Sequence, residues 1–154
     1  MMLFNESDIF FMREAYSQSL LAKEKNEIPI GAVLVRDGEI IGKAHNCTIT
    51  NNDPSAHAEV LAIRMGAARL NNHRLNDTKL YVTLEPCIMC LGVLIQARVN
   101  ELVFATPDSR VGVFSRKRYY EDKDLNHNLS IRSGLMKKEC EVLLKDFFLE
   151  RRNK

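Results

Sequence analysis

The chain has 154 residues, of which 45% are hydrophobic and 27% charged, as expected for one globular domain. Its longest apolar runs, such as Val33-Leu34-Val35, are too short to span a membrane, and its N-terminus lacks the basic and apolar segments of a signal peptide. Four cysteines without such a signal favour a reducing compartment, whereas a net charge of +2 does not by itself indicate a nucleic-acid partner. We expect a single cytoplasmic domain over residues 1–154 without a membrane partner.

Hydrophobic periodicity and turn residues predict alternating helices and strands. In chain order these are a helix ending near 26, strands at 29–35 and 39–44, a helix ending near 70, a strand at 79–84, a helix reaching 97, strands at 101–106 and 129–132, and a helix at 136–152. Asp37-Gly38 indicates a hairpin between the first two strands. The strand–helix–strand order from Thr83 to Thr106 predicts a parallel pair. We expect a three-layer α/β/α domain with a central mixed five-stranded sheet.

Two separate motifs contain residues that bind metal ions. His57-Ala58-Glu59 lies at the predicted start of the second helix, after Pro54 and Ser55, and Pro86-Cys87-Ile88-Met89-Cys90 lies at the start of the third. One His and two thiolates can hold a Zn²⁺ ion and leave the fourth tetrahedral position for water. At a helix start His57 and Glu59 can reach the same site. The sequence therefore predicts one zinc ion per chain, bound by His57, Cys87 and Cys90.

This combination is the signature of zinc deaminases that act on nucleobases. Deamination needs hydroxide at neutral pH, and zinc lowers the pKa of bound water from about 16 to about 7 in the most favourable sites. Two thiolates would cancel the charge of the metal, so water bound here should be a weaker acid than at a site of three neutral histidines. We therefore expect Glu59 to be a necessary proton shuttle while the zinc-bound hydroxide attacks the base.

Other interpretations of these motifs are possible. The Cys-x-x-Cys pair could be a redox pair, although thiol exchange would give the neighbouring His and Glu no role. Cys47 could close the zinc site as a fourth ligand and make it structural. The remaining residues of these types are expected elsewhere: Cys140 in the core, and His45, His73 and His127 in loops or at the surface.

Segments beyond the two motifs carry a family resemblance. They are residues 28–35, Asn46, 53–59, 81–90, Asn126-His127, and Asp146-Phe147-Phe148 with Arg151-Arg152. Together they resemble the bacterial tRNA-specific adenosine deaminases of the wider cytidine deaminase superfamily, over nearly the whole chain. The zinc motif alone would indicate only the superfamily. Asn46, the Asn-His pair and the C-terminal Phe and Arg pairs indicate the tRNA branch.

The resemblance implies a cytidine-deaminase-like fold, a homodimer, and conversion of the wobble adenosine of a tRNA anticodon to inosine. It implies that Asn46 hydrogen-bonds the target nucleoside and that Ala58 also binds substrate. It further implies that Asp108, Phe148 and Arg152 face the backbone of the anticodon loop. These residue types suit RNA loops, which proteins bind by stacking bases on aromatic rings and holding phosphates with Arg or Lys. The two C-terminal arginines could instead complement the helix dipole without any RNA.

One segment departs from the family. After Asp108 the family usually carries Lys-x-Gly-x-x-Gly-Ser, but residues 109–118 keep only Gly112 and Ser115 of this pattern, and Phe114 replaces a small residue. The departure affects the shape of a loop that is expected to contact RNA. It leaves the residues of the zinc motifs unchanged.

Two further functions are consistent with the same motifs. A deaminase of a free base or nucleoside would share the zinc chemistry, but it would leave the last helix and the basic cluster Arg116-Lys117-Arg118, beside Tyr119 and Tyr120, without a substrate to hold. A zinc-stabilised RNA-binding protein without activity would have no use for Glu59.

In the last helix Phe147 and Phe148 cannot both face inward, so one should be buried and the other exposed to a partner.

Overall fold

A computed structural model describes residues 3–117 and 127–153, apart from the side chains of 116 and 117. Its elements in chain order are α1 (Glu6–Glu24), β1 (Gly31–Arg36), β2 (Glu39–His45), α2 (Ala58–Leu70), β3 (Thr78–Leu84), α3 (Ile88–Ala97), β4 (Glu101–Thr106), the short π-helix η1 (Val113–Lys117), β5 (Ser130–Ser133) and α4 (Lys137–Arg152). The sequence predicts each of these except η1. Some residues named in the sequence analysis have side chains outside the described part of the chain. These are Arg116, Lys117, Arg118, Tyr119, Tyr120 and Asn126.

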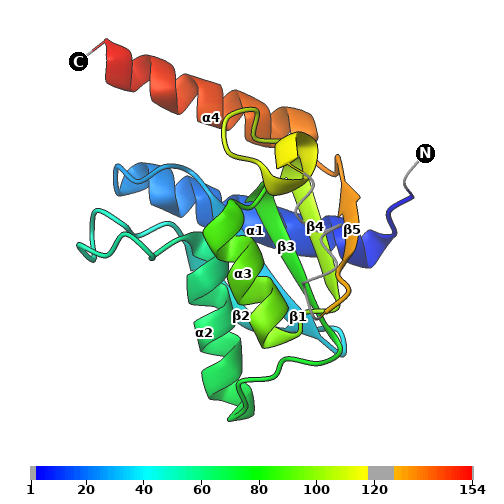
Figure 1. Cartoon of the computed structure of the whole chain (residues 1–154). Helices are drawn as coiled ribbons and strands as arrows, with labels where there is room; N and C mark the ends of the chain where they lie inside the picture. Colours follow the sequence, from blue (N-terminus) through cyan, green and yellow to red (C-terminus); the bar gives the residue numbers. More distant parts are fainter. Residues whose placement is uncertain (1–2, 118–126, 154) are drawn as a thin grey trace.

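The strands form one mixed sheet in the order β2-β1-β3-β4-β5 (Figure 1). β1 is antiparallel to both β2 and β3, whereas β3, β4 and β5 are parallel to one another. Asp37 and Gly38 join β1 to β2 with φ angles of 51° and 77°, the positive values that a two-residue type I′ hairpin turn requires. The predicted five-stranded mixed sheet, its hairpin and its parallel pair are thus confirmed.

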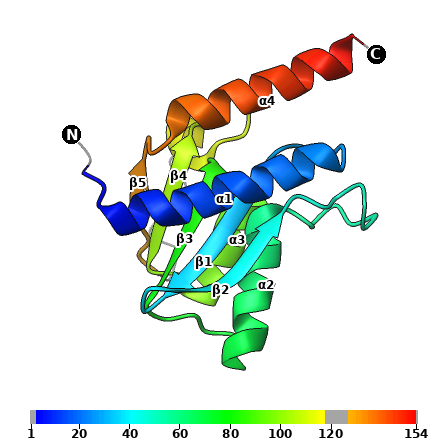
Figure 2. The same ribbon diagram turned by 180° about the vertical axis from the view of Figure 1, so that it is seen from behind.

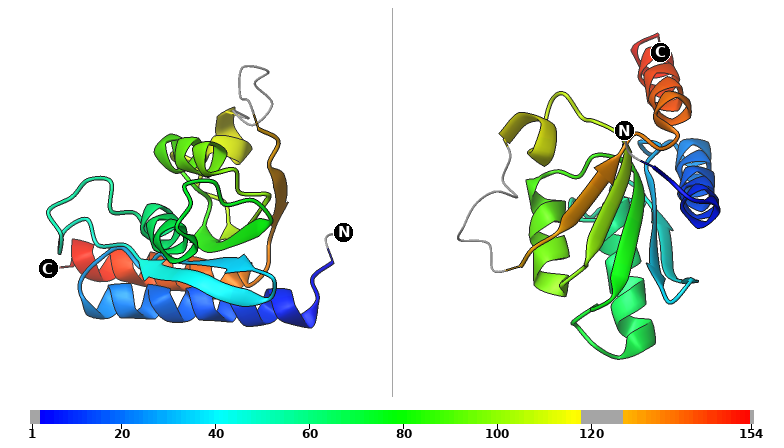
Figure 3. Two further views of the ribbon diagram at one scale, coloured as in Figure 1. Left: turned by 90° about the horizontal axis from the view of Figure 1, so that it is seen from below. Right: turned by 90° about the vertical axis from the view of Figure 1, so that its right-hand side faces the viewer.

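Helices cover both faces of the sheet. α1 and α4 lie on one face of the sheet, the face turned toward the viewer in Figure 2. α2 and α3 lie on the other face, as the two views of Figure 3 show. Successive side chains of a strand point to opposite faces, so Ala32 and Leu34 join the core cluster on the α2 face, and Val33 and Val35 join the one on the α1 face. The predicted three-layer α/β/α architecture is confirmed. No helix in the described part of the chain is long and apolar enough to cross a membrane.

A partly buried ion-pair network joins the start of α1 to the sheet. Asp8, which is 2% exposed, accepts hydrogen bonds from the Tyr81 hydroxyl at 2.7 Å and from both terminal nitrogens of Arg132 at 3.0 Å. Arg132 also donates to Glu101 at 2.7 Å. Burial raises the pKa of Asp8, but the hydrogen bonds from Arg132 and Tyr81 outweigh it and bring that pKa to about 2. The network therefore stabilises the fold with an ionised carboxylate.

Several predictions for single residues can be compared with the structure. Cys140 is 1% exposed and Phe147 is 4% exposed, whereas Phe148 is half-buried, so the core positions are as predicted. The prediction of a loop or surface position for His45 is wrong. This residue ends β2, is 8% exposed, and its Nδ1 lies 2.9 Å from the carbonyl oxygen of Asn46. Its polar ring tolerates burial because this contact replaces water.

The fold brings the two sequence motifs to one end of the sheet. The last residue of β3, Leu84, is paired with Thr106 at the end of β4, and α3 begins directly after β3. α2 packs against α3 and begins at the same end. In α/β sheets ligands bind beyond the carboxyl ends of parallel strands. The topology therefore favours a site at this end.

Candidate active site

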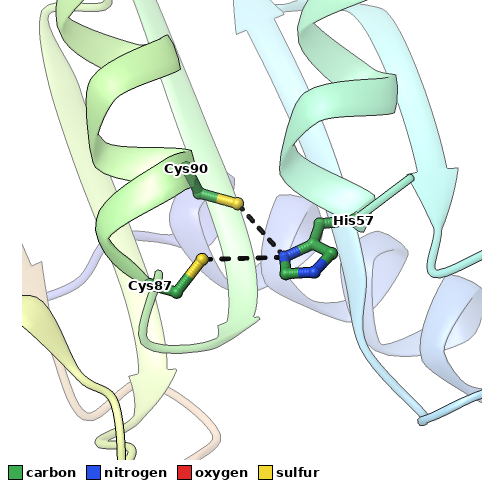
Figure 4. A group of neighbouring side chains, drawn as sticks. All are labelled: His57, Cys87 and Cys90. Carbon is green, nitrogen blue, oxygen red and sulfur yellow. Dashed lines mark hydrogen bonds between the residues drawn. The ribbon is translucent and has the colours of Figure 1, made fainter. Parts of the chain in front are cut away.

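Three possible metal ligands converge where α2 and α3 begin. His57 is the N-cap residue of α2, Cys87 is the N-cap residue of α3, and Cys90 lies in the first turn of α3. The Nδ1 atom of His57 lies 3.7 Å from the Cys87 sulfur and 3.4 Å from the Cys90 sulfur (Figure 4). Residues that are 30 positions apart in the chain are therefore brought within the reach of one ion.

The geometry of this cluster fits a zinc ion. Tetrahedral zinc, with Zn–S of about 2.3 Å and Zn–N of about 2.0–2.1 Å, separates sulfur from nitrogen by about 3.5 Å. The two observed separations lie on either side of this value. Within the described residues, this is the one group of three or more His, Cys, Asp or Glu side chains close enough to share an ion. Three protein ligands would leave a tetrahedral ion one open position.

The predicted alternative of a fourth ligand from Cys47 is not supported. Its sulfur lies 3.3 Å from the carbonyl oxygen of His45 and 3.5 Å from the Nδ1 atom of the same residue, so this thiol is engaged with its own strand end. All four cysteines lie in the described part of the chain and none forms a disulfide. The cluster therefore has the composition of an open site rather than a closed structural one.

Electrostatic interactions within the cluster favour metal binding. A hydrogen bond from the Cys90 thiol lowers the pKa of Cys87 to about 4, although burial acts in the opposite direction. The same hydrogen bond, and then burial, raises the pKa of Cys90. The hydrogen bond with Cys87 raises the pKa of His57. The Cys87 sulfur thus holds negative charge at the N-terminus of α3, whose dipole favours a thiolate, and this charge would attract a cation to the cluster.

Glu59 lies beside the cluster without being part of it. It occupies the first turn of α2, is 4% exposed, and contacts the Cys90 thiol. Burial raises its pKa above the usual value of a glutamate, so this carboxyl group takes up a proton more readily than an exposed one would. A carboxyl group that gains and loses a proton in a buried site has the properties of a general acid and base.

Asn46 fixes the start of α2. Its side-chain oxygen accepts a hydrogen bond of 2.8 Å from the backbone N–H of Ala58, and both residues are buried. His57, although it is the N-cap residue, makes no side-chain capping bond, so Asn46 satisfies a helix donor that the usual cap would satisfy. The amide group of Asn46 also lines the site, next to His57 and Glu59.

A groove of about 790 Å³ extends from the cluster to α4. His57, Glu59 and Cys87 line its inner end, residues 106–111 form a wall, and one face of α4 borders its outer part. The outer part carries four basic side chains, an aromatic ring and one acidic side chain, Glu141, which pairs with Lys145 at 3.1 Å. The basic and aromatic residues are Arg110, Lys137, Lys145, Phe148 and Arg152. A groove of this composition can hold an extended polyanion whose reacting part reaches the cluster.

The structure brings most of the predicted substrate-binding residues to this groove. Phe148 and Arg152 line it from α4, and the guanidinium of Arg110 lies 5.5 Å from the centre of the Phe148 ring. Asp108 also lines the groove, but one of its carboxylate oxygens accepts the N–H of Arg110 at 2.9 Å within its own loop. Ala58 is fully buried and is not among the lining residues.

Sequence reasoning missed several groove residues. Lys137 and Lys145 line the groove, and their helical spacing with Phe148 is the signal that could have identified them. Glu85 also borders the groove, although its side chain is almost completely buried. Its position between a strand and Pro86 gives no indication of its partners, which are 23–30 residues further along the chain.

The fold and the cluster define a zinc-binding deaminase class. The family model for the cytidine and deoxycytidylate deaminase zinc-binding region matches residues 5–106, a stretch that contains both motifs. This match places the chain in that family and agrees with the open His-Cys-Cys cluster at the end of the sheet.

Longer similarities identify the branch. The chain is 43% identical to the tRNA-specific adenosine deaminase of Haemophilus influenzae, over 96% of this chain and 87% of that protein. It is 41% identical to the protein of the same name from Bacillus subtilis, over 96% of this chain and 92% of that protein. A solved structure from a study of A-to-I editing by tRNA:A34 deaminases superposes with a TM-score of 0.86 at 38% identity, covering 88% of this chain and 99% of that one. The chain belongs to the family of tRNA-specific adenosine deaminases.

Proposed function

We propose that this chain converts adenosine to inosine at the wobble position of a tRNA anticodon, by hydrolysis that releases ammonia. One observation carries the proposal: an open His-Cys-Cys cluster with a buried glutamate lies at the inner end of a groove whose outer part is basic and aromatic. The inner end suits deamination of a base, and the outer part suits the RNA around it. Membership of the tRNA-specific family supports the choice of substrate.

His57, Cys87 and Cys90 would hold one Zn²⁺ ion, which supplies Lewis-acid activation of water at neutral pH. Glu59 takes a proton from the attacking water and delivers it to N1 of the adenine ring as the new C–O bond forms at C6. Glu59 then moves the second proton of the water, now on the new C6 hydroxyl, to the exocyclic nitrogen. When the C–N bond breaks, the C6 oxygen becomes the carbonyl of inosine and ammonia leaves. The raised pKa of Glu59 supports this residue as the group that carries both protons.

The remaining proposed contacts position the RNA. Asn46 donates an amide N–H to the nucleoside while its oxygen holds the N-terminus of α2. Ala58, which is buried, would act only through its backbone at this end of the groove. Phe148 offers a ring on which a base can stack, Arg152 contacts phosphate, and Asp108 shapes the loop that faces the anticodon backbone.

The decisive assay compares substrates that differ in one feature. An anticodon stem-loop with a wobble adenosine is incubated with the protein, beside a stem-loop whose adenosine lies elsewhere in the loop, free adenosine and free cytidine. Inosine in the first RNA alone supports the proposal. Conversion of a free nucleoside in the absence of RNA conversion would contradict it and favour the small-substrate alternative.

Further measurements test the metal and the assembly. Metal analysis should find about one zinc ion per chain, lost in Cys87→Ala and retained in the matched variant Cys47→Ala, whose thiol lies outside the cluster. A homodimer remains a prediction that sedimentation analysis can test. A cytoplasmic location also remains a prediction, consistent with four free cysteines.

A further inference from the structure

The carboxylate of Glu85 is the centre of a dense group of hydrogen bonds. The residue is 2% exposed and follows β3 directly. One oxygen accepts the N–H of Asp108 at 2.9 Å and the hydroxyl of Ser115 at 2.6 Å. The other accepts the N–H groups of Phe114 and Ser115, each at 2.8 Å. Each oxygen thus has two donors, so the carboxylate has little capacity left for a substrate.

All these donors belong to one segment, residues 108–115, which follows β4, includes the start of η1 and is called the loop below. The loop is packed so closely on the carboxylate that a Cβ atom at Gly112 would collide with it. The N–H of Val113 also reaches the carbonyl oxygen of Pro86 at 3.3 Å. Glu85 and Pro86 are followed immediately by the proposed zinc ligand Cys87. The loop is therefore attached to the same short segment that carries a ligand.

This loop forms a wall of the groove. Ser109, Arg110 and Val111 line it together with Asp108, and the Arg110 guanidinium lies over the Phe148 ring of α4. On the side away from the groove, the Phe114 ring stacks on Phe104 of β4 with 5.9 Å between the ring centres. With four hydrogen bonds, the buried carboxylate makes more polar contacts to this loop than the Val113–Pro86 bond does, so it contributes most to the distance between the wall and the metal cluster.

We propose that Glu85 is a positioning residue for RNA: it sets the distance between the metal cluster and the wall that contacts the nucleotides next to the target. This inference rests on the proposed function and goes beyond it, because it assigns substrate binding to a side chain that touches no substrate. It predicts that loss of the carboxylate weakens RNA binding while the chemistry of a bound adenosine is nearly preserved.

The test replaces Glu85 by glutamine. An amide of the same shape presents an N–H₂ group to loop donors and removes the charge, so the loop should move. We expect KM for the wobble-adenosine stem-loop to rise about tenfold or more, kcat to change less than threefold, and the zinc content to stay as in the wild type. Asp8→Asn is the matched control, since Asp8 is an equally buried carboxylate with several donors at a site that does not line the groove. It should lower the melting temperature without changing KM.

A double-mutant cycle strengthens the test. Ser115→Ala removes one donor and should raise KM severalfold, but it should have little further effect in the Glu85→Gln background because the two residues act through one contact. Should Glu85→Gln not fold, Ser115→Ala and Gly112→Ala carry the test. An unchanged KM in these variants, additive effects, or an equal rise of KM in Asp8→Asn would overturn the inference. If the wild type does not convert the RNA, the proposed function fails separately, and the Kd for the same stem-loop still tests Glu85.

Discussion

Replacing Asn46 by alanine should damage both stability and activity, and the two effects have separate causes. The side-chain oxygen of Asn46 is 2.8 Å from the N–H of Ala58, in a position where both residues are buried. The N-cap residue of α2, His57, offers no side-chain bond to replace it. The variant therefore leaves a buried backbone donor without its partner beside a proposed zinc ligand.

The size of each effect follows from the lost hydrogen bonds. Loss of a helix cap costs about 0.5–2 kcal/mol, and leaving a buried donor unsatisfied costs about 1–3 kcal/mol. We therefore expect Asn46→Ala to lower the free energy of unfolding by about 1–2 kcal/mol, which corresponds to a fall of about 2–8 °C in melting temperature at this chain length. Loss of one substrate hydrogen bond should lower kcat/KM at least about tenfold.

Thermal unfolding and steady-state deamination of the stem-loop measure the two effects. Asn100→Ala is a suitable control, because the side-chain oxygen of Asn100 also accepts a backbone N–H, that of Asp77 at 2.6 Å, but at an exposed site that does not line the groove. The control should lose less stability and no activity. A melting temperature unchanged in Asn46→Ala would refute the capping argument, and an unchanged kcat/KM would refute the contact with the nucleoside.

The remaining predictions concern the chemistry, the RNA and the fold. Glu59→Ala should keep zinc and lose activity by at least about a hundredfold, because no other group is proposed to move the protons. Cys87→Ala should lose zinc and activity together. Arg152→Ala should weaken RNA binding and reduce the slope of log Kd against log salt by about 0.7, whereas Arg151→Ala, whose side chain bonds the carbonyl of Asn26 instead, should leave the slope unchanged. Asp8→Asn should cost about 2 kcal/mol at pH 7, since the pKa of Asp8 falls from 3.8 to about 2 on folding. This stabilisation is complete above the unfolded pKa, so the gap between wild type and variant should close as the pH falls towards 2.

Each of these predictions has an outcome that would contradict it. Activity retained in Glu59→Ala would show that another group shuttles protons, and zinc retained at full affinity in Cys87→Ala would mean that the ligands are assigned wrongly. Equal salt slopes for the two arginine variants would indicate that α4 does not contact phosphate. Denaturant unfolding of the wild type and Asp8→Asn at pH 7 and pH 2.5 tests the role of Asp8. If the free energies of unfolding of the two proteins differ by the same amount at both pH values, the network does not depend on an ionised carboxylate.

Local signals in the sequence were sufficient to predict the helices and strands and the His-Cys-Cys metal cluster. Asp37-Gly38 defines a turn because few residues adopt positive φ angles, and a His-x-Glu motif with Cys-x-x-Cys defines a metal site because few side chains bind zinc. Contacts between distant residues could not be predicted in the same way. Asn46 and Ala58 meet only because β2 and the start of α2 converge, and the burial of His45 depends on where its strand ends. Such contacts depend on the tertiary fold, and one sequence contains no direct signal for them.

The loop after β4 shows how chemistry and substrate choice can vary separately in this fold. This is the segment in which the chain departs from its family, and both positions that keep the family pattern lie against the buried carboxylate. Gly112 leaves room for Glu85, and Ser115 donates to it. The residues between and around them face the groove or stack on the sheet, so they can change without moving the segment that carries Cys87. Selection for RNA binding in general would therefore restrict the anchoring contacts, which hold the wall in place, while selection for particular RNAs would act on the side chains that the loop presents.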